Sequence, residues 1–300
     1  MKISFVIPAY NEENYLKDCL ESIFREAENK NYDYEIIVVN NASTDKTKQI
    51  AKAFKNVKII DELEKGLVYA RKTGYLAATG DLIANIDSDS RLTSGWIDTV
   101  LSEFANDKKL VALSGPFIFY DLSRFMNRML GAFYYYSYCL YFVTNKIFKM
   151  GSILQGGNFV LRKSAFKKVG GYDEKIYSFY GEDANIALKM EKVGKINWTF
   201  KLPMYSSGRR LAAEGPFTMM LRYTVNYFWV LLFKKPFTKG FSDFRFKNKK
   251  ILSIHPRDLM RELVSAVLTI GAVVVLPLVI LVLIVYFTYA SLVNSKISVS

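Results

Sequence analysis

Short apolar runs alternate with amphipathic segments through the first 120 residues, and this alternation limits the fold more than any other feature of the sequence. The runs with the length and β-branched content of buried strands are 3–7, 35–39, 57–60 and 82–86. Apolar residues recur at helical spacing in the segments 15–24, 45–54, 66–79 and 94–104. Strands buried on both faces, alternating with helices, form a parallel sheet covered by helices on both sides. The sequence therefore predicts an α/β domain.

Polar segments follow the first, second and fourth of these strands, and they define the expected site. The segments are 8–12, 40–45 and 87–89. Parallel α/β sheets bind their ligands beyond the carboxyl ends of the strands, so these segments should meet at one edge of the sheet. Helix caps are also expected, from Asn11 or Asn14 for the first helix, Asp45 for the second and Ser94 for the fourth.

Asp87 and Asp89 stand one residue apart at the end of an apolar strand. Both carboxylates can turn toward one hard cation, and Mg²⁺ or Mn²⁺ is commonly held by one or two carboxylates plus substrate phosphates. Such a metal would neutralise the charge on a departing diphosphate. The first strand is not followed by G-x-G-x-x-G, and the sequence has no G-x-x-x-x-G-K-[ST]. A Rossmann dinucleotide site and a P-loop NTPase are therefore disfavoured.

Six segments, in order along the chain, together resemble the family 2 glycosyltransferases. They are 5–12, 36–45, 66–80, 86–89, 156–162 and 170–183. The resemblance covers about residues 1–215. It implies an inverting enzyme of the GT-A fold, a Rossmann-like, mostly parallel sheet flanked by helices, which uses a nucleoside-diphosphate sugar and a divalent metal, Mg²⁺ or Mn²⁺.

The resemblance also implies roles for individual residues on the donor side. The residues placed around the nucleotide and diphosphate are Pro8, Tyr10, Asn11, Glu12, Asn40, Asp45, Arg71 and Asp87. Asn40 stands where the family has an aspartate that contacts the base, and an amide donates as well as accepts, so the identity of the base stays open. Asp87 and Asp89 match the metal motif, with Asp89 as the direct ligand. For Asp45, capping a helix is the alternative role.

Inversion requires a carboxylate on the acceptor side that takes the proton of the attacking hydroxyl. The resemblance assigns this role to Asp183, with Glu182 beside it; the alternative is that both acids only cap a helix and favour its dipole. Residues expected to contact the acceptor or a phosphate are Gly157, Asn158, Arg209 and Arg210. Guanidinium forks suit phosphate oxygens, although the two arginines also fit an ordinary basic loop at a membrane surface.

The formal net charge is +13, and nine of the Lys and Arg residues lie between 234 and 261. They precede a stretch of 31 residues, 263–293, that contains no charge. About 20 apolar residues cross a bilayer, so we expect a transmembrane helix here, with a buried core helix as the alternative. The excess of positive charge before it predicts a cytoplasmic catalytic domain.

Aromatic residues are concentrated in two further segments, 129–145 and 217–233. Both are expected to be amphipathic helices at the membrane interface, and core helices that cover the sheet are the alternative. The predicted organisation is a catalytic domain at 1–215, a basic aromatic juxtamembrane segment at 216–262, the membrane span at 263–293 and a short tail at 294–300.

These features together predict a single-pass, membrane-anchored glycosyltransferase of cell-surface glycan or glycolipid assembly. It would act on a lipid-linked or glycolipid acceptor at an anionic membrane surface. A polyprenyl-phosphate monosaccharide synthase is the nearest alternative, and a non-catalytic membrane scaffold with a degenerate transferase fold is the alternative from another class. Nucleic acid is not expected as a partner, because the basic residues flank the predicted span and no nucleic-acid motif is present.

Overall fold

The computed structural model describes residues 1–28, 30–142, 145, 153–177, 181–238 and 264. The chain divides into two units, one made of 1–209 and 226–249 and the other of 210–225 and 250–300. The first unit carries the sheets and nearly all of the residues discussed below. The predicted span at 263–293 falls almost entirely outside the described residues, and so do most of the basic segment that precedes it and the whole tail at 294–300.

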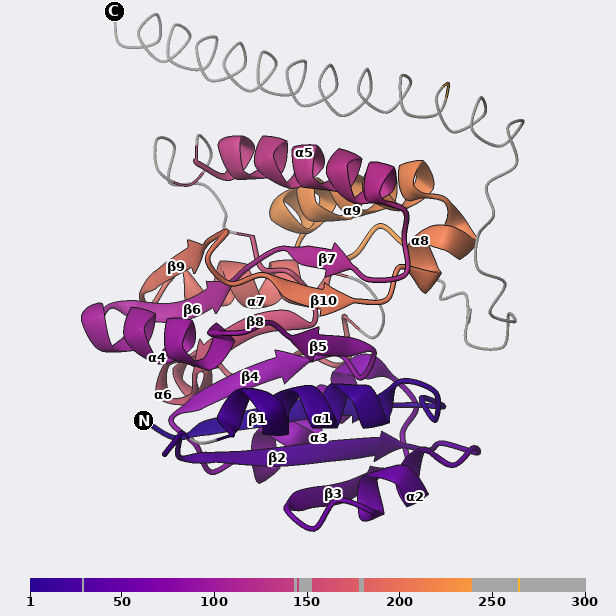
Figure 1. Ribbon diagram of the computed structural model, residues 1–300. Helices are drawn as coiled ribbons and strands as arrows, with labels where there is room; N and C mark the ends of the chain where they lie inside the picture. Colours follow the sequence, from indigo (N-terminus) through magenta and orange to yellow (C-terminus); the bar gives the residue numbers. More distant parts are fainter. Residues whose placement is uncertain (29, 143–144, 146–152, 178–180, 239–263, 265–300) are drawn as a thin grey trace, which may run out of the picture. The chain divides into compact units, whose positions relative to one another are not determined.

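A seven-stranded sheet forms the centre of the first unit, in the order β3-β2-β1-β4-β8-β6-β9 (Figure 1). Its strands are β1 (Ile3–Ala9), β2 (Tyr34–Asn41), β3 (Val57–Glu62), β4 (Leu82–Ile86), β6 (Leu110–Ser114), β8 (Asn158–Arg162) and β9 (Lys195–Trp198). The first four pair in parallel, as the alternating sequence pattern predicts. β8 is antiparallel to both of its neighbours, so the sheet is mostly, but not entirely, parallel.

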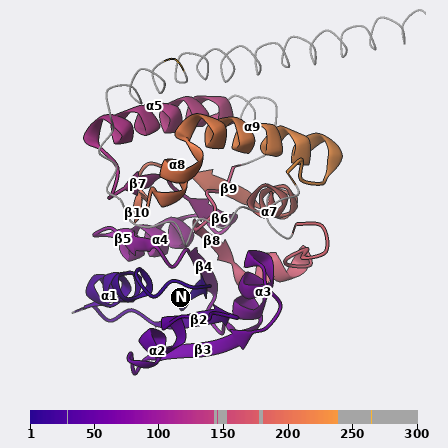
Figure 2. The ribbon, with the colours of Figure 1, turned by 90° about the vertical axis from the view of Figure 1, so that its right-hand side faces the viewer.

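Helices cover both faces of this sheet (Figure 2). One face carries α1 (Leu16–Ala27), α2 (Thr47–Lys52) and α4 (Trp96–Asn106); the other carries α3 (Leu67–Ala77), α6 (Lys163–Lys168) and α7 (Glu182–Met190). On the first face the fully buried ring of Trp96 packs 6.0 Å from that of Phe5. On the second face α3 lies against β1 so closely that a Cβ at Gly74 would meet Val6 at 2.3 Å. β1 and β4 are thus buried from both sides, whereas β3, predicted as a buried strand, lies at the edge of the sheet and is partly exposed.

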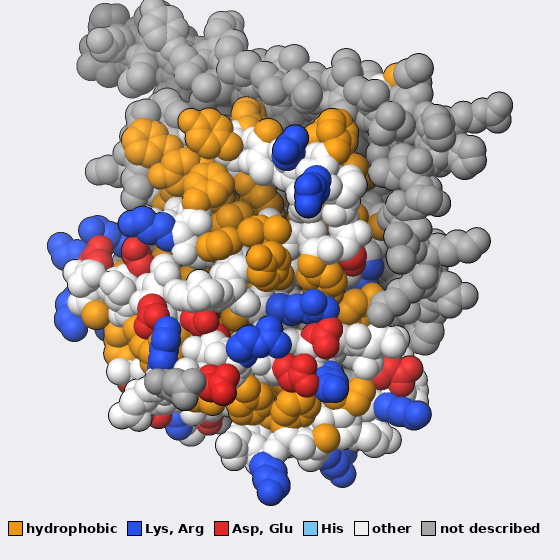
Figure 3. Space-filling view, viewed as in Figure 1, with side chains coloured by type: hydrophobic (Ala, Val, Ile, Leu, Met, Phe, Trp, Pro, Cys, Tyr) orange, Lys and Arg blue, Asp and Glu red, His pale blue; other side chains and the backbone are white. Residues whose placement is uncertain are grey.

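A second, three-stranded sheet has the order β5-β10-β7. Its strands are β5 (Ser90–Leu92), β7 (Phe117–Phe119) and β10 (Met204–Ser206), and α5 (Arg124–Tyr141) follows β7 in the chain. Tyr134 and Tyr138 of α5 pack on Trp198, with ring centroids 6.1 and 5.8 Å apart. Other large side chains of this region stay exposed, namely Ile118, Phe125, Tyr135, Phe142, Phe200 and Tyr205. Figure 3 shows hydrophobic side chains gathered over α5, β7 and β10, whereas charged side chains dominate the face around α1.

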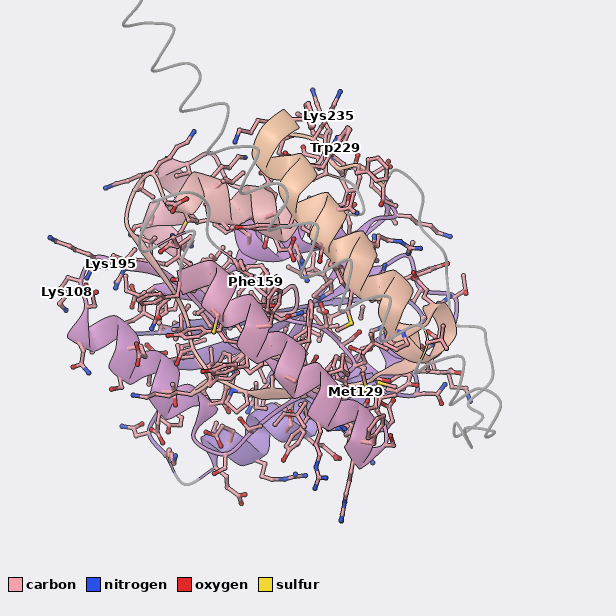
Figure 4. All side chains as sticks on the ribbon, turned by 90° about the horizontal axis from the view of Figure 1, so that it is seen from above. Lys108, Met129, Phe159, Lys195, Trp229 and Lys235 are labelled. Atoms are coloured by element: carbon pink, nitrogen blue, oxygen red, sulfur yellow. The ribbon has the colours of Figure 1, made fainter. Side chains whose placement is uncertain are left out.

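The remaining helices are α8 (Arg209–Glu214) and α9 (Pro216–Phe233). The segment 217–233 is therefore helical as predicted, and the helix expected at 129–145 starts earlier, at Arg124. The outer edge of the large sheet lies at β9, where Lys195 is close to Lys108 (Figure 4). Within the described part of the chain, no helix has both the length and the apolar composition that crossing a membrane requires.

Three details of the predicted elements differ. α1 begins at Leu16 with Tyr15 in the cap position, because the Asn11 side chain is bonded to a neighbouring loop instead. Gly95, not Ser94, precedes α4, since the chain enters that helix in a left-handed conformation with φ of 78° that glycine adopts without strain. The segment 196–202 is strand-like in the sequence, but the strand there, β9, ends at Trp198.

Asn158 joins the large sheet to the connections around it. Its side chain is fully buried; Nδ2 donates to the carbonyls of Gly115 (3.0 Å) and Leu202 (2.9 Å), and Oδ1 accepts from the Trp96 indole (3.2 Å). The amide therefore binds the protein's own groups and has no surface toward an acceptor, which is the role expected for it above.

We expect Asn158→Ala to lower the free energy of unfolding by about 2–4 kcal/mol, because it leaves several buried polar groups without partners. Urea denaturation measures this loss. Asn106→Ala is the matched control, since Asn106 makes one exposed hydrogen bond at the end of α4 and should change stability by less than about 0.5 kcal/mol. Equal effects of the two variants would contradict the structural role of Asn158.

Candidate active site

Polar loops meet at the carboxyl ends of β1, β2 and β4, as the strand order predicts. The loop after β1 is tied to the loop after β2. Asn11 Oδ1 accepts from the N–H of Thr44 at 2.8 Å, and the N–H of Glu12 donates to Thr47 Oγ1 at 2.7 Å. Asn11 itself adopts a left-handed φ of 53°. These bonds fix the loop that carries Glu12 toward the end of β4.

Arg71 is the buried centre of the site. Its side chain is 1% exposed, and its guanidinium donates from Nη2 to Asp87 Oδ1 at 3.0 Å and from Nη1 to Glu182 Oε1 at 2.8 Å. The guanidinium also lies 5.5 Å from the ring centre of Phe159. A charge buried this deeply requires partners of opposite sign. Burial alone would lower the pKa of Arg71, but the carboxylates of Asp87 and Glu182 outweigh it and hold the pKa above its ordinary value.

Glu182 and Asp183 are the first two residues of α7. Burial raises the pKa of Glu182 to about 7; the neighbouring Asp183 adds to the rise and Arg71 opposes it. Burial likewise raises the pKa of Asp183, opposed by the N–H of Ala184, which donates to Asp183 Oδ1 at 2.8 Å. Asp183 remains partly exposed whereas Glu182 is buried. The two adjacent acids thus differ: Arg71 binds Glu182, and Asp183 retains access to solvent.

Two consecutive glycines separate the carboxylates of Asp87 and Asp183. A Cβ at Gly157 would stand 2.1 Å from Asp87 Oδ2, and one at Gly156 would stand 3.4 Å from Asp183 Oδ2. Gly157 also has φ of +81°, which side-chain-bearing residues rarely adopt. Gly157 was expected to contact an acceptor or phosphate, and the structure places it directly against the Asp87 carboxylate.

We expect Gly157→Ala to be destabilising by about 2 kcal/mol more than Gly170→Ala, because the new methyl group would collide with Asp87. Gly170 has the same φ of +81°, and nothing lies within 4 Å of its added Cβ. The pair of variants therefore separates the collision from the backbone strain that both share. Denaturant titration of both proteins measures the difference, and equal losses would exclude the collision.

Arg209 binds Asp89, at one end of the Asp87–Asp89 turn, whereas Arg71 binds Asp87 at the other end. Arg209 donates from Nη2 to Glu12 Oε1 at 2.6 Å and from Nε to Asp89 Oδ2 at 3.0 Å. Burial raises the pKa of Asp89 to about 7; Glu12 and Asp87 add to the rise, and Arg209 opposes it. Arg209, expected at a phosphate, is therefore bound to one of the expected metal ligands.

The residues expected to hold a metal are two carboxylates, Asp87 and Asp89. Among the residues that the structure describes, no group of three Asp, Glu, His or Cys side chains is arranged to hold a metal ion. Hard divalent cations are nevertheless often bound by one or two carboxylates together with phosphate oxygens. Asp87 Oδ2 is not used by the bond to Arg71, and the Asp87 side chain is 34% exposed. The donor set thus fits a metal that binds together with a diphosphate.

Asn40 lies at the end of β2, opposite Asp61 of β3. Asn40 Nδ2 donates to Asp61 Oδ1 at 2.8 Å, and Lys48 pairs with Asp61 Oδ2 at 2.5 Å. The hydrogen bond from Lys48 and, to a lesser extent, the one from Asn40 lower the pKa of Asp61. Asp61 and Lys48 were not predicted as site residues. Asp61 directly follows the predicted strand at 57–60, so the rule used for the other strand ends would have found it.

The remaining predicted residues are more peripheral. Asp45 accepts from the N–H groups of Thr47 (2.9 Å) and Glu13 (3.1 Å), but it does not occupy the cap position of α2, which is taken by Lys46. Pro8 is buried inside β1. The Tyr10 ring lies 5.1 Å from the Lys65 ammonium. Arg210 belongs to the second unit, where it pairs with Glu214 at 3.1 Å.

Comparison with known sequences identifies the same family as the six motifs of the sequence analysis. The family described as "Glycosyl transferase family 2" matches residues 4–170. Glycosyltransferase GlyA of Streptococcus pneumoniae is 32% identical over 139 residues, 45% of this chain and 20% of GlyA. The probable glycosyltransferase YdaM of Bacillus subtilis is 29% identical over 210 residues, 64% of this chain and 47% of YdaM. A glucosyl-dolichyl phosphate glucuronosyltransferase of Haloferax volcanii is 24% identical over 58% of this chain and 56% of its own length.

The chain thus spans between a fifth and little more than half of the length of these relatives. Among solved structures, the mannosyltransferase PcManGT of Pyrobaculum calidifontis, in complex with GDP-Man and Mn²⁺, superposes with a TM-score of 0.59. It is 17% identical, and the match covers 91% of this chain and 75% of that one. This likeness confirms the predicted fold class of the sheet and its helices.

Proposed function

The chain belongs to glycosyl transferase family 2, and on this premise we propose that it transfers a sugar, with inversion, from a nucleoside diphosphate to an acceptor hydroxyl. The observation that carries the proposal is the buried chain of charges from Asp87 through Arg71 to Glu182, beside the partly exposed Asp183. One end of this chain is Asp87, a carboxylate suited to a metal and diphosphate. The other end is Glu182, which is adjacent to Asp183, a carboxylate suited to accept a proton. An inverting transfer needs one such group on each side of the anomeric carbon.

On the donor side, Asp87 and Asp89 would hold Mg²⁺ or Mn²⁺. When bound, the ion supplies positive charge for the departing diphosphate. Arg71 binds one oxygen of Asp87, so the other is left for the ligand. The similar structure of PcManGT contains Mn²⁺ with its GDP-sugar, which supports a divalent metal here.

On the acceptor side, Asp183 is the proposed base. The acceptor oxygen forms a bond to the anomeric carbon while the bond from that carbon to the diphosphate oxygen breaks, and its electron pair leaves with the diphosphate. The proton of the acceptor hydroxyl passes to the Asp183 carboxylate. Burial raises the pKa of Asp183 toward the range in which a carboxylate is an effective base. Glu182 positions Arg71, because its Oε1 is bound there.

At the nucleotide base, Asn40 is proposed to act as a hydrogen-bond acceptor. Asp61 is ionised and only accepts, so the Asn40 amide must turn its Nδ2 toward it. Asn40 Oδ1 then points away from Asp61, and among the described residues it has no hydrogen-bond partner. An asparagine held in this way can replace an aspartate opposite an N–H group of a base.

The proposed acceptor is a lipid-linked sugar, glycolipid or polyprenyl phosphate at the cytoplasmic face of a membrane. Exposed aromatic side chains of α5 support a membrane-facing surface, among them Phe125 (53% exposed) and Tyr135 (64%). The net charge of +13 would favour anionic lipids. The similar Haloferax volcanii protein is named for a dolichyl-phosphate-linked substrate. The predicted span at 263–293 would provide the anchor.

Calorimetric titration of the full-length protein with UDP, GDP, CDP and dTDP tests the donor side. Each nucleotide is titrated with and without Mn²⁺, and Asp89→Ala is titrated in parallel. We expect one nucleotide to bind in a metal-dependent manner and to lose that binding in the variant. If the folded protein binds none of them, the proposal is wrong and a scaffold function takes its place. Transfer of radiolabelled sugar to lipid-linked and to soluble acceptors tests the acceptor; use of soluble acceptors alone would exclude the lipid-linked acceptor.

A further inference from the structure

Arg209 holds the site's expected metal ligand in an ion pair. The guanidinium lies between two carboxylates, Glu12 and Asp89, whose side chains are 5% and 14% exposed. It reaches them from a position 197 residues away from Glu12 in the sequence. The carbon of the guanidinium also lies 4.4 Å from the ring centre of Tyr15. The two acidic side chains, Glu12 and Asp89, are therefore already paired with one positive charge, that of Arg209.

The backbone that carries Arg209 is fixed by Asp121. Asp121 accepts from Ser207 Oγ and from the N–H of Gly208, both at 2.5 Å. Ser207 Oγ in turn accepts from the N–H of Arg209 at 3.2 Å. The loop is thus held by three hydrogen bonds while the long Arg209 side chain remains the part that can change partners.

We propose that Arg209 is a built-in cation that competes with the divalent metal for Asp89 and gives up this pair when a nucleoside diphosphate binds. The inference rests on the proposed function and extends it to the order in which ligands are bound. The guanidinium repels a second cation and engages Asp89 Oδ2, so the metal alone should bind weakly. A diphosphate offers Arg209 two oxygens in the planar geometry that guanidinium groups prefer.

Metal and nucleotide should then bind cooperatively. The diphosphate attracts Arg209 away from Asp89, which frees the carboxylate for the metal, and the metal frees Arg209 for the diphosphate. By linkage, each ligand increases the affinity for the other by the same factor. Replacing Arg209 should raise the affinity for the metal alone and reduce this mutual effect.

The test measures the dissociation constant of Mn²⁺ for the full-length protein by electron paramagnetic resonance of the free ion, alone and with UDP or GDP. Three variants are compared with the unmodified chain: Arg209→Gln, the double variant Arg209→Gln/Glu12→Gln, and Arg25→Gln. The double variant removes the guanidinium and one carboxylate together, so it does not leave an extra buried charge if the single variant fails to fold. Arg25 is an exposed arginine of α1 and controls for the loss of one positive charge.

We expect Mn²⁺ alone to bind about ten-fold more tightly to both Arg209 variants and not to Arg25→Gln, within the usual 5- to 150-fold range of coupling between sites. The increase in Mn²⁺ affinity caused by the nucleotide should shrink by a similar factor. Unchanged or weaker Mn²⁺ binding in both Arg209 variants, or no Mn²⁺ binding by any protein, would overturn the inference. If none of UDP, GDP, CDP and dTDP binds but Mn²⁺ binding still tightens, the proposed donor fails while the competition at Asp89 stands.

Discussion

Asp183→Asn is expected to lower kcat for sugar transfer by about 10³-fold, within the 10²- to 10⁴-fold range of a general base. The amide keeps the size of the side chain and can still accept from the N–H of Ala184 through its oxygen. It cannot take the proton of the acceptor hydroxyl. The dissociation constant of the nucleotide with Mn²⁺ should therefore change by less than about three-fold. Initial rates at saturating donor and acceptor, together with calorimetry, measure both quantities.

Glu182→Gln is the comparison that distinguishes the two neighbouring acids. Its effect should appear mainly in stability and donor binding, because Glu182 is bound by Arg71 and not available to the acceptor. If Glu182→Gln abolished turnover while Asp183→Asn left it near normal, the assignment of the base would be reversed. A pair of acids that only capped α7 would give small effects on turnover in both variants.

Arg71→Met is expected to lower the free energy of unfolding by about 3–5 kcal/mol, because it leaves Asp87 and Glu182 without their buried partner. Methionine retains much of the volume of the side chain, so the loss reports the charge and not a cavity. Urea denaturation of the full-length chain at pH 8 measures it. The double variant Arg71→Met/Glu182→Gln should recover part of the loss, since it removes one of the two unpaired carboxylates.

Lys72→Met is the control, one residue further along the same helix. Lys72 pairs with Glu174 at 2.5 Å, but its side chain is 40% exposed. A solvated pair of this kind contributes less than about 1 kcal/mol. If the Lys72 and Arg71 variants lost equal stability, burial of the Arg71 pairs would not be the cause.

The sequence pattern predicted the parallel core of the fold because each of those strands is a continuous apolar run with a helix behind it. It did not predict β8 as an antiparallel strand, since a five-residue segment with three apolar residues looks the same in either direction. The three-residue strands of the small sheet were also missed. Strands this short carry almost no periodicity, and they exist because distant segments pair with them.

The candidate site, like the fold, was predicted from the sequence only in part. Asp87, Arg71 and Glu182 were identified through motifs, whereas the ion pairs between them join residues up to 111 positions apart. Spacing along a chain contains no information on such pairs. Asn158 shows a second limit of prediction from sequence. An asparagine that follows two glycines has the same sequence pattern whether its amide is buried and structural or binds a ligand. The four bonds of Asn158 inside the protein became visible only with the fold.

The position of β8 between β4 and β6 also determines when this protein can fold during its synthesis. Once the ribosome has made residue 86, the strands β1 to β4 are complete. The edge of β4 that pairs with β8 then has no partner until β8 is synthesised some 70 residues later. An unpaired apolar edge invites pairing with other chains. Truncated products that end before residue 158 should therefore aggregate, and a chaperone that shields this edge would matter most during that interval of translation.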